Sequence, residues 1–538
     1  MDCHQPSAAE LANAALPHFS RRAVLRLATA AGLGATAIAP LATRVDRAVA
    51  AQAPAPGGDL IATYNAEPPS LDPHLSPAFL TSRVTELVYN GLVRYDATFV
   101  VEPDLAAGWT VSDDQLSYTF ELRPDVRFHN GRALTADDVV YSFERILNES
   151  DTNRSDLLGS VARVTAADDE HIVFILNTPY APFLANLATP GMYVVAEEVV
   201  AEHGSLDTVA IGSGPFMFEE WAPNGHITLV RNPDYFEADL PYLDSITLQF
   251  LPEESDRLDA VRGAQAHQAV LRDPASREAL ANDDSVRIVD VPDLNFHVIG
   301  FKTSQPPFDD VRVRQAISLA VDRQELIDTT AFGIGEIAGP IPPALTDWAL
   351  PTDELPFYES DVERARALLA EAGYAEGFSA TIMTSPAYQE MVSDAQIVQT
   401  RLRAIGIELE IEQEAWDVYV DRWLNRDFEM YSGINSQFSD DPDYSLYPAL
   451  HTGGPWNVSE FSNPDVDRLL DAGRTTLDAV ARKDVYDQLQ RLLAEQAPLL
   501  WTYSGMITDA VSTRLNGYVV LPNESRASLR ESWLAAED

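Results

Sequence analysis

The sequence predicts an α/β protein that is divided into more than one lobe. At 538 residues, the chain is too long to fold around a single hydrophobic core. Between residues 378 and 411, an alternating strand, a helix that Gly406 ends and a second alternating strand follow one another. Such an order is typical of a mixed, mainly parallel sheet covered by helices. With 46% hydrophobic and 9% aromatic residues, the chain can also fill large cores.

The chain is strongly acidic, with a formal net charge of -46 at pH 7. Nearly all of its positive charge is arginine, since the only two lysines are Lys302 and Lys483. A field of this sign repels nucleic acid and anionic membrane surfaces, so we expect neither as a partner. The composition fits both an ordinary solvated acidic surface and an adaptation to high salt.

The first 53 residues have the pattern of an export signal followed by a linker. Arg21 and Arg22 precede a weakly hydrophobic run, residues 27–42, as in a Tat signal peptide. This run is shorter than a comfortable membrane span. Two cleavage motifs follow, Ala-Val-Ala at 48–50 and Ala-Gln-Ala at 51–53. We therefore predict Tat export to the periplasm or the cell exterior, without stable membrane insertion of the mature chain.

The one cysteine, Cys3, precedes this signal. The mature chain is therefore expected to contain no disulfide bond and no cysteine metal site. Because no cysteine follows the apolar run, we expect no lipoprotein anchor either.

The first half of the mature chain is predicted to be rich in strands. Apolar and polar residues alternate in these segments, and the Asn224-Gly225 turn joins two of them into a hairpin. Thr135 and Asp138 form a capping box that starts a helix. The expected strands are residues 59–65, 118–122, 216–229 (a hairpin) and 245–251, and helices are expected at 81–90, after Thr135, and at 256–262.

The second half opens with the most regular stretch of the chain, residues 301–328. A strand edge and a Pro-Pro turn lead into a long amphipathic helix, with Asp309 and Asp310 where an N-cap and a first-turn acid belong. Its apolar stripe is Val313, Ala316, Ile317, Ala320 and Val321, and its polar face is Arg312, Arg314, Gln315 and Asp322. Further helices are expected at 358–373 (with a Ser360–Glu363 capping box), 394–405 and most of 461–493, and strands at 378–384, 407–411 and 498–502.

Four segments resemble sequence motifs of one protein family, and they follow one another in the same order as in that family. They read EPDLAAGWTVSDDQLSYTFELRPDVRFHNGRALTADDVVYSFERIL at 102–147, GSGPFMFEEWAPNGHITLVRNPDYFEADLPY at 212–242, FKTSQPPFDDVRVRQAISLAVDRQELID at 301–328 and YESDVERARALLAEAGY at 358–374. Together they resemble the extracytoplasmic solute-binding proteins of ABC importers, the peptide/nickel/oligosaccharide family (family 5). The resemblance covers residues 58–525. One departure is GAQAHQAV at 263–270, where the family has an acidic turn.

The resemblance implies a two-lobe fold like that of type II periplasmic binding proteins, with mixed sheets in each lobe joined by a hinge. It implies lobe I at residues 54–90 and 209–290, an accessory subdomain at 91–208, lobe II at 291–504, and a return to lobe I with a C-terminal tail at 505–538. Such a protein is a monomer that captures a solute between its lobes and delivers it to a membrane permease with a cytoplasmic ATPase.

No catalytic sequence pattern competes with this interpretation. The motifs G-x-S-x-G, GxxxxGK[ST], H-E-x-x-H and a GxGxxG after a strand are all absent. The run FSDDPD at 438–443 holds three acids that could serve catalysis or calcium, but Pro442 indicates a loop and the EF-hand pattern is not met. We predict no enzyme activity, no cofactor and no metal, His129 included. An exported hydrolase that uses acidic residues, or an extracytoplasmic chaperone or scaffold, is the alternative.

The ligand-binding residues are expected in loops at strand ends. There aromatic side chains can bury a ligand and a few polar groups can orient it, although each aromatic could equally pack in a core. The candidates are Asn65, Glu67, Ser385, Tyr388, Trp416, Asn435, Phe438 and Asp440.

The resemblance also bears on the ligand. Related dipeptide binders hold the amino end with an acid four residues before an Asp-Pro proline, and the carboxylate with an arginine in a loop of the second lobe. Phe438 and Ser385 stand at these positions here. A buried charged terminus without a counter-charge costs several kcal/mol. A free dipeptide would therefore need Asp440 or Asp441 for its amine, and an oligosaccharide or a longer or modified peptide is favoured.

Overall fold

The computed structural model describes residues 53–76, 78–149, 154–280 and 282–536. The predicted Tat signal and its cleavage motifs lie outside the described residues, apart from Ala53. The described chain has the predicted α/β architecture, built around one large mixed sheet. Its strands are, in spatial order, β15 (Ile407–Gln413), β14 (Phe378–Thr384), β16 (Met430–Asn435), β12 (Val286–Phe301), β17 (Leu499–Ser512), β11 (Gln268–Leu271), β1 (Asp59–Tyr64), β10 (Ser245–Phe250), β9 (His226–Arg231) and β8 (Phe216–Ala222), while β13 (Glu336–Ile337) pairs with β17 outside this order.

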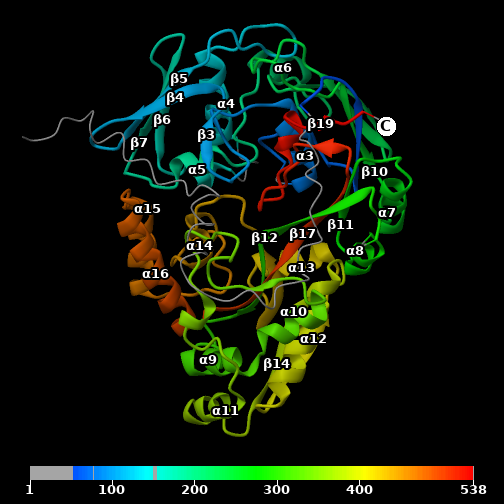
Figure 1. Cartoon of the computed structure of the whole chain (residues 1–538). Coiled ribbons are helices and arrows are strands. Elements are labelled where there is room, and N and C mark those ends of the chain that lie inside the picture. Colours follow the sequence, from blue (N-terminus) through cyan, green and yellow to red (C-terminus); the bar gives the residue numbers. More distant parts are fainter. Residues whose placement is uncertain (1–52, 77, 150–153, 281, 537–538) are drawn as a thin grey trace, which may run out of the picture. The chain divides into compact units, whose positions relative to one another are not determined.

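Two long antiparallel strands, β12 and β17, make this sheet continuous. They have 16 and 14 residues and pair along almost their whole length. β12 also pairs with β16, and β17 also pairs with β11. We call β14–β16 the β14 half of the sheet and β1 with β8–β11 the β1 half. Figure 1 shows β12 and β17 between β10 and β11 on one side and β14 on the other.

Parallel pairing is limited to each half of the sheet. β1 is parallel to β10 and β11, and β14 is parallel to β15 and β16. The strands that join or flank these groups are antiparallel. A mainly parallel sheet is therefore the right description of residues 378–411 but not of the whole sheet.

Helices flank both halves of this sheet. The helices in or next to the β1 half are α3 (Phe79–Val88), α7 (Glu254–Arg262) and α8 (Pro274–Leu280). Those of the β14 half are α9 (Val311–Ala320), α10 (Arg323–Thr330), α11 (Val362–Glu371), α12 (Gln389–Arg403), α13 (Trp416–Leu424), α14 (Asp443–Leu450), α15 (Pro464–Thr475) and α16 (Ala479–Gln496). Among the described residues, none of the helices combines the length and apolar character that crossing a membrane requires.

A separate four-stranded antiparallel sheet precedes the hairpin of the β1 half. Its order is β4 (Ala106–Val111), β5 (Ser117–Leu122), β7 (His171–Leu176) and β6 (Val161–Ala166). Helix α4 (Ala136–Asn148) packs against β6 and β7 and begins at the predicted Thr135–Asp138 capping box. The connecting elements are the hairpin β2 (Val93–Tyr95) and β3 (Val101–Pro103), the short helix η1 (Ser155–Leu158), and helices α5 (Phe183–Leu187) and α6 (Glu197–His203).

The predicted long helix of residues 301–328 is two helices. Val321 is extended, and the Asp322 carboxylate accepts the backbone N–H of Gln324 at 3.0 Å, which caps α10. The apolar spacing continues through the break because both helices pack into the same core, with Ile317, Val321 and Leu326 almost completely buried. Periodicity alone therefore missed the break.

The predicted polar face of this stretch is also partly wrong. Arg314 and Gln315 are buried, and their side chains donate hydrogen bonds to the backbone carbonyls of Glu495, Gln496 and Ala497 at the end of α16. Carbonyls at a helix C-terminus have no partner within the helix, so two side chains that look solvent-facing in sequence satisfy them. Similarly, Asp361 rather than Ser360 caps α11.

The C-terminal segment is tied to the sheet by a buried ion pair. Arg526 donates to Asp509 of β17 with two hydrogen bonds of 2.7 and 2.8 Å, and both side chains are fully buried. The Tyr518 hydroxyl donates to the same carboxylate at 2.5 Å. The predicted strand of residues 498–502 is thus only the start of β17, which continues to the residue that anchors the C-terminus.

Removing one member of this pair should destabilise the protein strongly. Replacing Asp509 with alanine leaves the Arg526 charge buried and unpaired, and we expect a loss of about 3–5 kcal/mol in the free energy of unfolding. Replacing Arg468, whose pair with Asp465 is exposed, should change it by less than about 1 kcal/mol. Urea unfolding of both variants measures the difference, and equal losses would contradict this assignment.

Candidate functional site

The register of the strands places the carboxyl ends of both halves next to the same point of β12 and β17. β16 runs from Met430, opposite Phe301, to Asn435, opposite Phe296. β11 runs from Gln268, opposite Val511, to Leu271, opposite Thr508. In the β12–β17 pair, Phe296 and Thr508 lie on either side of a register shift. The parallel strands of both halves therefore end facing this shift.

In open α/β sheets, ligands bind outside the carboxyl ends of the strands. The predicted ligand-binding residues all follow or end such strands, and we call their loops the carboxyl-edge loops. Asn65 and Glu67 follow β1, Ser385 and Tyr388 follow β14, Trp416 follows β15, and Asn435, Phe438 and Asp440 end or follow β16. The structure therefore brings the loops together from strands that are far apart in sequence.

Tyr388 and Trp416 form an exposed aromatic surface in these loops. Their ring centroids lie 4.8 Å apart, edge to face, and Trp416 also stacks on Tyr419 at 5.3 Å. Tyr419 is buried and donates its hydroxyl to the Ser432 carbonyl, whereas Trp416 is 43% and Tyr388 40% exposed. A buried tyrosine thus holds an indole that presents much of its area to solvent, which suits stacking on a ligand.

Ser385 and Glu67 are already engaged in hydrogen bonds within the protein. The Ser385 hydroxyl is fully buried and donates to the Glu414 carbonyl at 2.9 Å. The Glu67 carboxylate accepts from the Trp221 indole N–H and from the backbone N–H of Asn224, which fixes the β8–β9 hairpin. These two residues shape the loops, while Asn65 is exposed at the end of β1 and Asn435 is half-buried.

Phe438 and Asp440 contact residues from the other part of the chain. The Phe438 ring packs on Phe79 with centroids 4.7 Å apart, and its carbonyl accepts from Asn523 at 3.1 Å. The Asp440 carboxylate accepts from the Tyr95 hydroxyl at 2.9 Å. These contacts join the loop after β16 to α3, to the β2–β3 hairpin and to the C-terminal segment.

The acid run at residues 438–443 is paired throughout. Asp441 makes a buried two-pronged pair with Arg482, and Asp443 pairs with Arg474. Burial, and then the charge of Asp441, raises the pKa of Asp440 to about 6. In the described chain no group of three or more His, Cys, Asp or Glu side chains is arranged to hold a metal ion. Tyrosine and arginine side chains of the protein itself therefore occupy the three carboxylates of this run.

A further acid lies at the register shift itself. The Asp293 carboxylate accepts from the backbone and side-chain N–H groups of Asn295 at 2.9 and 3.0 Å. Burial, and then the nearby charge of Glu524, raises the pKa of Asp293 to about 7. Asp293 thus lies in β12, within the interruption of the β12–β17 pairing between Pro292 and Phe296.

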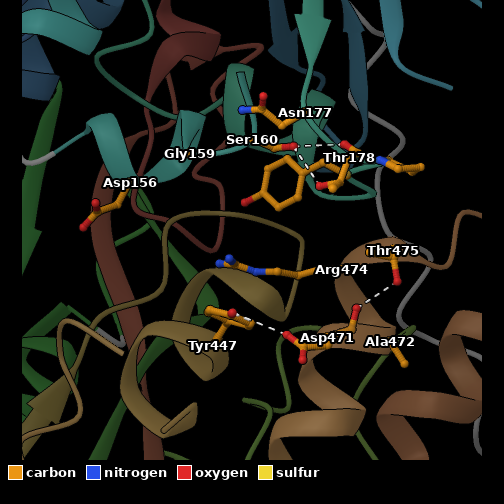
Figure 2. A pocket seen from close by; sticks show the side chains of 12 residues that line it. Asp156, Gly159, Ser160, Asn177, Thr178, Tyr447, Asp471, Ala472, Arg474 and Thr475 are labelled. Carbon is orange, nitrogen blue, oxygen red and sulfur yellow. Dashed lines mark hydrogen bonds between the residues drawn. The ribbon is translucent and has the colours of Figure 1, made fainter. Parts of the chain in front are cut away.

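A cavity of about 420 Å³ lies beside the acid run, away from the aromatic surface. One wall comes from residues 156–160 and 177–180, next to η1, β6 and β7, and the other from α14 and α15. Figure 2 shows Arg474 next to the ring of Tyr447, across from Ser160 and Thr178. The guanidinium carbon lies 3.2 Å from the centroid of that ring.

Sequence reasoning missed several residues of this region. Tyr95, Phe79 and Asn523 contact the loop after β16 but lie 85 to 359 positions away from their partners along the chain. No local pattern identifies them, because each is an ordinary residue of a short strand, a helix or a loop. Tyr419 could have been found, since it lies one helical turn after Trp416.

Comparisons with known proteins agree with this geometry. Residues 100–457 match the family model of bacterial extracellular solute-binding proteins, family 5. A heme-binding protein A from Haemophilus influenzae is 30% identical over 475 residues, covering 81% of this chain and 85% of that protein. The dipeptide-binding protein of Escherichia coli is 28% identical over 501 residues, covering 86% and 92%. Among solved structures, an ABC transporter-associated periplasmic binding protein from Helicobacter pylori in complex with the peptide STSA matches with a TM-score of 0.77 and 27% identity, covering 89% of this chain and 98% of that one. The chain therefore belongs to the family 5 extracellular solute-binding proteins, the two-lobe substrate receptors of ABC importers.

Proposed function

We propose that this protein captures a solute between the β1 half and the β14 half of its sheet and delivers it to a membrane permease. The observation that carries the proposal is the convergence of the carboxyl-edge loops of both halves on the β12–β17 register shift. Tyr388 and Trp416 offer an exposed aromatic surface there for the ligand. Residues 54–290 and 505–536 form the first lobe, including the accessory subdomain at 91–208, and residues 291–504 form the second.

The described conformation is held by contacts between these proposed lobes. Tyr95 reaches Asp440, Phe79 packs on Phe438, and the Ala181 N–H donates to the Arg474 carbonyl at 2.8 Å. β12 and β17 are the long strands shared by both lobes, so a change in their twist at residues 292–296 moves one lobe against the other. Closure then presents one joint surface to a permease, which works with a cytoplasmic ATPase.

The ligand is inferred from the two anchor positions. Phe438 is engaged by Phe79, and the Ser385 hydroxyl is buried and bonded to a carbonyl, so neither supplies a charge for a peptide terminus. Asp440 already accepts a hydrogen bond from the Tyr95 hydroxyl, so its carboxylate is engaged within the protein. We therefore propose a ligand held by stacking and neutral hydrogen bonds, such as an oligosaccharide or a longer or end-modified peptide.

We also propose that the mature protein acts as a monomer outside the cytoplasm after Tat export, and that it performs no catalysis. The alternative of an exported hydrolase predicts turnover when peptides or glycosides are supplied. The family assignment favours the receptor, since family 5 proteins are solute-binding receptors.

A thermal-shift screen of the mature protein tests the ligand class. A ligand that binds the folded state raises the melting temperature with the logarithm of its concentration over Kd. We expect oligosaccharides or end-blocked peptides to stabilise the protein and free dipeptides to have little effect. Equal stabilisation by dipeptides with two free ends would contradict the proposal that the site lacks charged anchors for peptide termini. Hydrolysis of any compound would instead support the alternative of an exported hydrolase.

Trp416 is expected to carry much of the affinity. Replacing it with alanine should weaken binding of the stabilising compound at least about tenfold. The variant loses the free energy of the apolar area that the indole buries and, in addition, roughly 0.5–1.5 kcal/mol of aromatic stacking. Calorimetric titration measures the change. Val480→Ala, at a 74% exposed position on α16, is the matched control and should leave the affinity unchanged. An unaltered affinity in Trp416→Ala would remove this residue from the site.

Asp440 should make the stability of the protein depend on pH. An aspartate in the unfolded chain titrates near about 3.9, whereas burial raises the pKa of folded Asp440 to about 6. Between these values the folded state binds a proton that the unfolded state lacks, so the Asp440 contribution is lost as pH rises through 6. Asp440→Asn stays neutral and should therefore lose less stability between pH 5 and pH 8, by on the order of 1 kcal/mol.

Urea midpoints at both pH values provide this measurement. Asp113→Asn, on an exposed turn, is the control and should follow the unmodified protein. A steeper loss of stability in Asp440→Asn than in the control would show that Asp440 is held as a carboxylate.

A further inference from the structure

We propose that the cavity beside Arg474 is a second binding site, distinct from the carboxyl-edge loops, for a small zwitterion such as a free α-amino acid. The cavity measures about 420 Å³, within the usual size of small-molecule sites. Its two walls belong to segments that are far apart in the chain, the β6–β7 region and α14–α15.

Arg474 supplies the group for a ligand carboxylate. Its Nε donates to Asp443 at 2.9 and 3.1 Å, and the face of its guanidinium lies on the Tyr447 ring. Within the described part of the chain, its Nη1 and Nη2 atoms make no hydrogen bond. The side chain is 27% exposed and lines the cavity. An arginine fixed by its Nε and its ring contact thus keeps a two-pronged edge for a planar carboxylate.

Carboxylates on the two walls supply the opposite charge. Asp156, from η1, is exposed, and its carboxylate forms no hydrogen bond with other described residues. Asp471 lines the facing wall on α15, where its carboxylate accepts from the Tyr447 hydroxyl at 3.4 Å and lies 3.6 Å from His451. Figure 2 shows Asp156 on one wall of the cavity, and Asp471 with Arg474 on the other. An ammonium group placed there is attracted by either carboxylate.

These charges favour a ligand that carries both signs. A simple anion would meet Asp156 and Asp471 as well as the field of a chain with a net charge of -46. A simple cation would leave the free edge of Arg474 without an acceptor. A zwitterion satisfies both sets of groups, and the Asn177 amide and the Ser160 hydroxyl on the first wall add neutral hydrogen-bonding groups.

Occupation of this cavity has a consequence for closure, which rests on the proposed function. Tyr180 and Arg474 line opposite walls, with the guanidinium carbon 5.5 Å from the centroid of the Tyr180 ring. The N–H of the next residue, Ala181, donates to the Arg474 carbonyl. A ligand that contacts both walls binds best when they are close, so it shifts the population toward the closed form. The cavity ligand then raises the affinity of the carboxyl-edge loops for their own ligand. By thermodynamic linkage, the ligand of those loops raises the affinity of the cavity by the same factor.

A ligand-observed NMR titration with L-alanine tests the site in the mature protein. Acetate and ethylammonium, the two halves of the zwitterion, serve as single-charge probes. We expect saturable binding of L-alanine and at least about tenfold weaker binding of either probe, because each lacks one charge-assisted contact. Asp156→Asn and Arg474→Lys should each weaken L-alanine binding about tenfold or more. Asp465→Asn, on the exposed first turn of α15, should not.

The titration also separates this site from the main one. Binding of L-alanine should persist in Trp416→Ala, since that residue lies outside the cavity. If Trp416→Ala abolishes it and Asp156→Asn leaves it intact, L-alanine occupies the carboxyl-edge loops and the second site is wrong. Equal binding of L-alanine and acetate would also overturn it. Binding in the cavity without any stabilising oligosaccharide or end-blocked peptide in the thermal-shift screen would retain this site and reject the proposed ligand class alone.

Discussion

The pairing of β12 with β17 is the constraint on which the rest of the structure depends. Every other strand of the large sheet is joined, directly or through neighbours, to one of these two. Their register fixes which way β11 and β16 point, and therefore where the loops after the parallel strands lie. The interruption between Pro292 and Phe296 is the irregular part of that pairing. A single pair of strands thus sets both the location of the carboxyl-edge loops and the place where we propose that the two halves bend.

Several buried charges in this protein hold together segments that are distant in sequence. Arg526 ties the C-terminus to Asp509, Arg482 fixes Asp441, and Arg314 caps the end of α16. Arginine suits these positions because its planar guanidinium can serve several acceptors at once. The abundance of arginine over lysine therefore has a structural use at these positions, whatever the origin of the acidic surface.

The acid run after β16 illustrates how position decides the role of a residue type. Three aspartates within six residues could suggest a metal or catalytic site. In the structure one meets a tyrosine and the other two meet arginines. The segment consequently connects the β2–β3 hairpin to α15 and α16. Its paired arginine, Arg474, leaves a free edge toward a cavity, while the aromatic pair on the other loops stays open for a ligand.

The sequence by itself determined the family, most elements and several caps, because these rest on local order and spacing. The Thr135–Asp138 box, the Asn224-Gly225 turn and the apolar stripe after Asp310 are all recognisable within a few residues. Only the tertiary structure decided that the stripe spans two helices, that Arg314 is buried, and that Asp440 meets Tyr95 across 345 positions. A side chain's partner determines its charge state and its availability to a ligand, and partners brought together by long-range strand pairing leave no periodic trace in the sequence.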